Sequence, residues 1–129
     1  MFKMNKKIFV YGTLMKGGDL NNYLKNCKFL GVGKLNNFAM YSNGYYPMIK
    51  RKINSSVFGE IYLVSSEEYK KLIPLLDYIE REYKRIEVFV EFNKKLVKVE
   101  TYVYNYPTNN LYLIKSGNWK LKGGKNGSK

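Results

Sequence analysis

The chain has 129 residues, of which 45% are hydrophobic, and its 23 Lys and Arg against 10 Asp and Glu give a net charge of +13. A chain of this length can form one core, so a single domain is expected. It contains no histidine, and Cys27 is its only cysteine. This composition excludes an internal disulfide, a Ser-His-Asp triad, imidazole acid–base catalysis and cysteine–histidine zinc sites. Any chemistry must use carboxylates, hydroxyls, lysines or the backbone.

The distribution of charged and apolar residues indicates a soluble cytoplasmic protein. No apolar stretch approaches the ~18 residues of a membrane span, and the first residues lead into no long apolar segment with a cleavage site. The basic residues are spread along the chain, which favours a solvated lysine-rich surface; binding of nucleic acid through charge alone is kept as an alternative. We expect the domain to span residues 1–121 and residues 122–129, KGGKNGSK, to form a disordered basic tail.

The first elements in chain order are short apolar runs separated by Gly, Asn and Ser. Residues 7–11 predict a buried strand, and Asp19 is placed to cap a short helix whose apolar residues share one face. Four more short strands are predicted from similar runs, over residues 29–32, 38–41, 46–49 and 57–64.

A helix is predicted within SSEEYKKLIPLLDYIERE, residues 65–82. Ser65 and Glu68 have the spacing of a capping box, and apolar residues recur at helical period. Pro74 is expected to kink or restart the helix near its middle.

Glu80 is the most informative carboxylate of this helix. It follows Ile73 and Leu76 at the i+7 position of the same apolar stripe. Partial burial disfavours the charged form of a carboxylate and raises its pKa toward the range of a general base. Spacing alone leaves open the alternative of a surface glutamate at a fraying helix end.

Residues 85–92 and 96–104 form the clearest strand pair. Both segments alternate apolar with polar residues on either side of a turn at residues 93–95, which predicts a hairpin with one buried face. Many strands with two short helices predict an α+β fold whose sheet curls into a small mixed β-barrel with short flanking helices.

Six motifs then occur together and in order over nearly the whole chain. They are FVYGTLMKG at 9–17, YSNGYYPMI at 41–49, VFGEIYLV at 57–64, LLDYIE at 75–80, EYKRIEVFV at 82–90 and LIKSGNW at 113–119. The set resembles the gamma-glutamylcyclotransferase-like family, particularly its small bacterial branch related to gamma-glutamylamine cyclotransferases. This resemblance implies the small-barrel fold of that family.

The resemblance also implies a site. In the family, the Tyr-Gly-Thr-Leu turn lies at the mouth of the barrel and its backbone amides hold the glutamyl part of the substrate, while a glutamate of the Leu-Asp-x-x-Glu stretch does acid–base work. Matched residue by residue, Tyr11, Gly12, Thr13 and Leu14 become substrate-binding residues, and Glu80 becomes the catalytic carboxylate. Glycine permits close backbone approach, and amides that follow a strand can form an anion-binding concavity.

Four further residues are candidates for the pocket. Tyr46 and Pro47 match a family loop near the site, and Tyr83 matches a Tyr-x-Arg pattern, although each could instead pack within the sheet. Many relatives have a longer, glycine-containing bend before that pattern, whereas here only Arg81 and Glu82 separate it from the glutamate. Glu82 is therefore the reserve candidate for the acid–base residue.

The implied reaction is intramolecular. The alpha-amine of a gamma-glutamyl amine or peptide attacks its own gamma-carbonyl, which releases 5-oxoproline and a free amine. A carboxylate can move the protons of this reaction, so we expect an enzyme with a small-molecule substrate and no cofactor or metal. The alternative is a catalytically silent small-molecule-binding module on the same fold.

Overall fold

The computed structural model describes residues 5–121, so the predicted tail at residues 122–129 lies outside the described part. Within the described range the strands are β1 (Lys6–Val10), β2 (Lys28–Ser42), β3 (Pro47–Val64), β4 (Tyr83–Phe92), β5 (Lys95–Tyr104) and β6 (Tyr112–Ile114). The α-helix is α1 (Ser66–Ile79), and the two 3-10 helices are η1 (Asn21–Leu24) and η2 (Trp119–Leu121). No helix of residues 5–121 has the length and apolar character needed to cross a bilayer.

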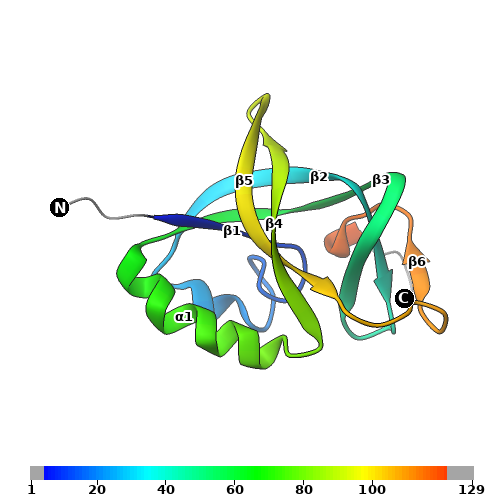
Figure 1. Ribbon diagram of the computed structural model, residues 1–129, viewed down its shortest axis with the longest axis horizontal. Coiled ribbons are helices and arrows are strands. Elements are labelled where there is room, and N and C mark those ends of the chain that lie inside the picture. Colours follow the sequence, from blue (N-terminus) through cyan, green and yellow to red (C-terminus); the bar gives the residue numbers. More distant parts are fainter. Residues whose placement is uncertain (1–4, 122–129) are drawn as a thin grey trace.

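The strands close into a barrel-like ring. Their order is β3-β1-β5-β4-β2, and β2 pairs with β3 again, while β6 is added beside the end of β2. β1 runs parallel to β5 and antiparallel to β3, so the sheet is mixed. Figure 1 shows α1 and the loop that follows β1 on the same side of this ring. The predicted α+β fold with a small mixed barrel is confirmed.

β2 and β3 are longer than predicted. The four short strands expected from the sequence form parts of these two long strands. The segments with Asn and Gly between them do not end the pairing. The register shifts between Phe29 and Gly31 and again between Asn36 and Phe38. Asn37 adopts a φ of 64°, a left-handed conformation that asparagine tolerates better than most residues. The breaks expected from composition are therefore irregularities inside continuous strands.

The β4–β5 hairpin has the predicted buried face, but its turn is one residue shorter than predicted. Val88 and Val90 are buried, whereas Phe89 between them is 59% exposed. The turn consists of Asn93 and Lys94, both with positive φ, as a two-residue hairpin turn requires. Lys95, expected in the turn, already belongs to β5.

α1 begins as predicted but does not restart at Pro74. The Ser65 hydroxyl accepts a hydrogen bond from the N–H of Glu68 at 3.1 Å, and the helix continues without a break to Ile79. Pro74 removes one backbone donor, but burial of residues on both sides of it keeps the helix packed on the barrel. These buried residues are Leu72, Ile73 and Leu76.

β1 separates two hydrophobic cores. Phe9 belongs to the core inside the ring, while Ile8 and Val10 belong to a second core under α1. Trp119 packs against both cores. Because β1 is buried on both faces, the loop that follows it is held where the ring and the helix meet.

Candidate functional site

A pocket of about 500 Å³ lies where β1 ends, α1 ends and β4 begins. This volume is ordinary for a small-molecule site. All nine candidate residues from the sequence line it: Tyr11, Gly12, Thr13, Leu14, Tyr46, Pro47, Glu80, Glu82 and Tyr83. The structure therefore brings together residues from segments that are up to 72 positions apart in the chain (83 − 11).

The loop after β1 is tightly folded by its own backbone. Met15 N–H donates to the carbonyl of Gly12 at 3.0 Å, and Leu20 N–H donates to the carbonyl of Thr13 at 3.0 Å. Within residues 5–121, the backbone N–H groups of Gly12, Thr13 and Leu14 donate no hydrogen bond. These three amides at the pocket wall are thus available to a ligand.

Gly12 is required by a close contact with Pro47. A Cβ atom at position 12 would lie 2.5 Å from Cγ of Pro47, which is far inside van der Waals contact. Pro47 in turn accepts a hydrogen bond on its carbonyl oxygen from the Tyr83 hydroxyl at 2.9 Å. Tyr46 is more than half exposed and lies at the rim. Gly12, Pro47 and Tyr83 therefore shape the wall as one packed unit.

Asp19 lines the pocket but does not cap the short helix, contrary to expectation. The N-cap residue of η1 is Leu20, which makes no side-chain cap hydrogen bond. The N–H of Leu20 is already bonded to Thr13, and that of Asn21 is bonded to Gly18 at 3.2 Å. The cap position falls one residue after Asp19, on a leucine whose side chain has no oxygen to accept a hydrogen bond from the amides of the helix.

Glu60 holds the loop from the barrel side. Its side chain is nearly fully buried, and Oε1 accepts hydrogen bonds from Lys16 N–H at 2.8 Å and from the Tyr62 hydroxyl at 3.1 Å. Oε2 pairs with Nζ of Lys120 at 3.1 Å. Sequence reasoning did not include Glu60 in the site; the one signal was a carboxylate after Gly59 within an apolar strand.

Glu80 ends α1 at the pocket wall. Its N–H donates to the carbonyl of Leu76 at 2.7 Å, and the chain turns away after it. The side chain is half-buried, and none of the hydrogen bonds or ion pairs within residues 5–121 involves its carboxylate. Burial raises the pKa of Glu80 to about 7. The carboxylate therefore exchanges a proton near neutral pH.

The two candidate carboxylates have different environments. Glu80 is partly desolvated, whereas Glu82 is exposed, although both line the pocket. Burial, followed by the charge of Glu80, raises the pKa of Tyr83, and burial with the Tyr83 and Glu80 charges raises that of Tyr11. Both phenols therefore stay protonated beside Glu80, and each donates its single O–H to a backbone carbonyl, that of Tyr102 for Tyr11 and that of Pro47 for Tyr83.

The charged residues of the pocket are mostly acidic. Asp19, Glu80 and Glu82 line it together with one basic residue, Arg81. The Arg81 guanidinium donates to the carbonyl of Tyr78 at 3.0 Å and lies over the Tyr78 ring at 4.8 Å. Within residues 5–121 no group of three or more acidic or cysteine side chains could hold a metal ion.

Comparison with known proteins identifies the family. The family model described as "Gamma-glutamyl cyclotransferase, AIG2-like" matches residues 8–121. The chain belongs to this family. It is 31% identical over 113 residues to the gamma-glutamylcyclotransferase family protein YtfP of Escherichia coli K12, and the match covers 88% of this chain and 95% of YtfP.

Solved structures agree with the gamma-glutamylcyclotransferase fold. The uncharacterized protein PH0828 from Pyrococcus horikoshii matches with a TM-score of 0.72 and 27% identity over 89% of this chain and 90% of that one. An AIG2-like protein from Mus musculus matches with a TM-score of 0.76 over 94% of this chain and 92% of its own; at 24% identity this match supports the fold alone. The resemblance seen in the sequence is confirmed, and with it a gamma-glutamylcyclotransferase-like function at the level of the family.

Proposed function

We propose that the protein is a gamma-glutamylcyclotransferase that converts gamma-glutamyl amines or peptides into 5-oxoproline and a free amine. The observation that carries this proposal is the half-buried Glu80 carboxylate, which has no partner among the described residues and shares one pocket with three available backbone amides.

The loop after β1 binds the glutamyl group. The N–H groups of Gly12, Thr13 and Leu14 offer three donors to the alpha-carboxylate or to the oxygen of the gamma-carbonyl as it becomes negative. These donors belong to a loop that is held by its own hydrogen bonds and by Glu60. A rigid donor set lowers the cost of holding the substrate folded, with its amine close to its gamma-carbonyl.

Glu80 moves the protons. As a carboxylate it removes a proton from the alpha-ammonium group, and the free amine then attacks the gamma-carbonyl, forming the ring C–N bond. As the bond to the leaving amine breaks and the gamma-carbonyl re-forms, the protonated Glu80 returns this proton to the departing nitrogen. The ring nitrogen loses its second proton, which protonates the released amine. A pKa of about 7 suits both steps, since the group is readily ionised and readily protonated at neutral pH.

The acidic rim favours a leaving amine that carries a second positive charge. Asp19 and Glu82 are exposed at the pocket, while the guanidinium of Arg81 is engaged by Tyr78. A gamma-glutamyl diamine therefore meets a complementary charge, whereas a gamma-glutamyl dipeptide brings a carboxylate to the same rim. We expect a higher kcat/KM for the diamine conjugate than for the dipeptide at low ionic strength.

The proposal is tested by measuring 5-oxoproline release from a panel of gamma-glutamyl amines and peptides with three proteins. Glu80→Gln keeps the size and polarity of the side chain but cannot carry the proton, so kcat should fall by about 10²-fold or more. The variant should still bind 5-oxoproline with near wild-type affinity, because the loop donors remain. Glu82→Gln is the matched control and should retain turnover.

The other outcomes are equally specific. Loss of turnover in the Glu82 variant alone would move the acid–base assignment two residues along the chain. Normal turnover in both variants would end this mechanism. Binding of 5-oxoproline by a wild-type protein that turns over no member of the panel would establish the silent binding module instead.

A further inference from the structure

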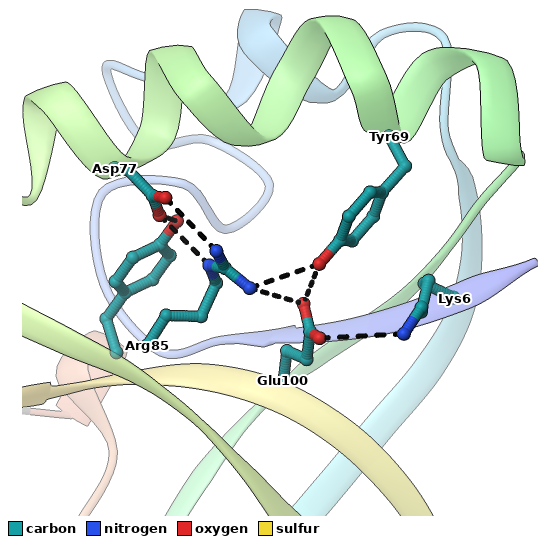
Figure 2. Close-up of polar contacts among 6 residues, drawn as sticks. Lys6, Tyr69, Asp77, Arg85 and Glu100 are labelled. Atoms are coloured by element: carbon teal, nitrogen blue, oxygen red, sulfur yellow. Dashed lines mark hydrogen bonds and ion pairs between the residues drawn. The ribbon is translucent and has the colours of Figure 1, made fainter.

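A polar network joins α1 to three strands of the barrel beside the pocket (Figure 2). Its centre is Arg85 on β4, and its other members come from α1, β1 and β5. Arg85 contacts Asp77 with two of its nitrogens and Glu100 with the third, and Tyr69 donates to Glu100 at 2.6 Å. Lys6 approaches the other oxygen of Glu100 at 3.9 Å. None of these five residues lines the pocket, so the network is placed to act through its neighbours.

The contact between Arg85 and Asp77 has a defined geometry. Nε of Arg85 lies 3.0 Å from Oδ1 of Asp77, and Nη2 lies 3.2 Å from Oδ2. The side chains of Arg85 and Asp77 are 31% and 44% exposed, so the pair contributes little to stability as an isolated charge interaction. Two parallel hydrogen bonds do, however, fix the relative orientation of a carboxylate and a guanidinium.

This pair spans the turn that carries Glu80. Asp77 lies three residues before Glu80 in the last turn of α1, and Arg85 lies five residues after it on β4. Between them the chain reverses, with the N–H of Tyr83 donating to the carbonyl of Glu80 at 2.9 Å. The Asp77–Arg85 contact therefore closes the connection between helix and barrel on either side of Glu80.

Asp77 is also tied to a wall of the pocket. The hydroxyl of Tyr102, a pocket residue on β5, donates to Oδ1 of Asp77 at 2.6 Å. The carbonyl of Tyr102 accepts a hydrogen bond from the Tyr11 hydroxyl at 2.6 Å. The Asp77 carboxylate thus links the end of α1 to β4 and β5. Through Tyr102 it is also linked to Tyr11, which begins the loop after β1.

We propose that the Asp77–Arg85 ion pair positions Glu80 by fixing the last turn of α1 against β4 and β5. This inference rests on the proposed function, in which Glu80 is the acid–base group. The Glu80 carboxylate has no hydrogen-bond partner among residues 5–121, so its position depends on where the helix ends. Asp77 and Arg85 are positioning residues in this account, since neither touches the pocket.

Arg85→Lys, Asp77→Asn and the double variant test the proposal. Lysine keeps the charge but cannot form the two-point contact, and asparagine keeps the shape but loses the charge. Arg51→Lys is the matched control, because Arg51 is exposed on β3 and lies over the Phe38 ring, away from the network. Circular dichroism and thermal unfolding establish that each variant is folded.

Two readouts are measured. For steady-state 5-oxoproline release, each single variant should lose about tenfold or more in kcat with KM within about twofold, since a small displacement of a catalytic group is costly. The double variant should be no slower than the worse single variant, because both changes break one contact. In carbon-13 NMR without substrate, the Glu80 carboxyl should titrate at lower pH in the variants, as a loosened helix end admits water.

The outcomes separate this proposal from the proposed function. If a folded Arg85→Lys protein keeps both kcat within about twofold and the Glu80 titration of wild type, the positioning role is overturned. If wild-type protein releases no 5-oxoproline, the proposed function fails, and the NMR titration alone then decides: a shift in the variants supports positioning, and an unchanged titration overturns it. A change of similar size in the Arg51→Lys control would also overturn it.

Discussion

Replacing Glu80 with Gln should make the protein more stable at alkaline pH while it removes activity. The folded state holds the Glu80 proton more tightly than the unfolded chain does, because the pKa is about 7 in the folded protein against an ordinary value of 4.5. Stability from this group is fully present below about pH 4.5 and is lost as the pH rises through about 7. Glutamine does not ionise, so in the variant position 80 causes no loss of stability over this pH range.

The size of the effect follows from the two pKa values. At ~1.4 kcal/mol per pKa unit, the difference between 4.5 and about 7 corresponds to roughly 3 kcal/mol. This is an upper bound, because the half-buried carboxylate keeps part of its hydration. The measured quantity is the free energy of unfolding of Glu80→Gln minus that of wild type. This difference should increase by up to this amount between pH 4 and pH 8.5.

Urea unfolding followed by circular dichroism at several pH values measures this difference. The comparison across pH cancels any constant effect of the amide on packing. Glu82→Gln provides the control, since it removes an exposed carboxylate from the same pocket. A flat profile for Glu80→Gln, or one that decreases toward alkaline pH, would refute the account of a desolvated carboxylate.

Three other outcomes are expected. The kcat/KM of wild type should fall about tenfold per pH unit below pH 7, as Glu80 becomes protonated. If kcat/KM begins to fall only near pH 4.5, the assignment of Glu80 is contradicted. Gly12→Ala should raise KM by roughly tenfold, within the ~1–3 kcal/mol range of overpacking, because its Cβ meets Pro47, and unchanged KM would argue against the loop as the binding element. Glu60→Gln should lower the free energy of unfolding by about 1–3 kcal/mol, measured in urea, since the amide cannot pair with Lys120; an effect below ~0.5 kcal/mol would show that the loop does not depend on Glu60.

Several features of the fold depend on near neighbours in the chain, and these were predicted from the sequence. The alternation over the β4–β5 hairpin sets its buried face, and the spacing of Ser65 and Glu68 sets the start of α1. The stripe shared by Ile73, Leu76 and Glu80 indicated that this glutamate would be partly buried. Local periodicity is sufficient for such features because side chains two to four residues apart share a face.

Other features followed only from contacts between distant segments. The long strands β2 and β3 persist through Asn and Gly because each is paired along its length with the other, and this pairing overrides local turn preferences. Helix α1 continues through Pro74 because its packing on the barrel compensates the lost hydrogen bond.

The site also combines features that the sequence indicated with features that depend on contacts between distant segments. The sequence by itself indicated nine of the pocket residues, because their types and order match a family and because a glutamate on an apolar stripe is open to desolvation. Only the tertiary structure brought Glu60 to Lys16 and Lys120, and Asp77 to Arg85 and to Tyr102 on β5. Such contacts have no period in the sequence. They exist because the strands close into a ring, which places the ends of β1 and α1 at one pocket.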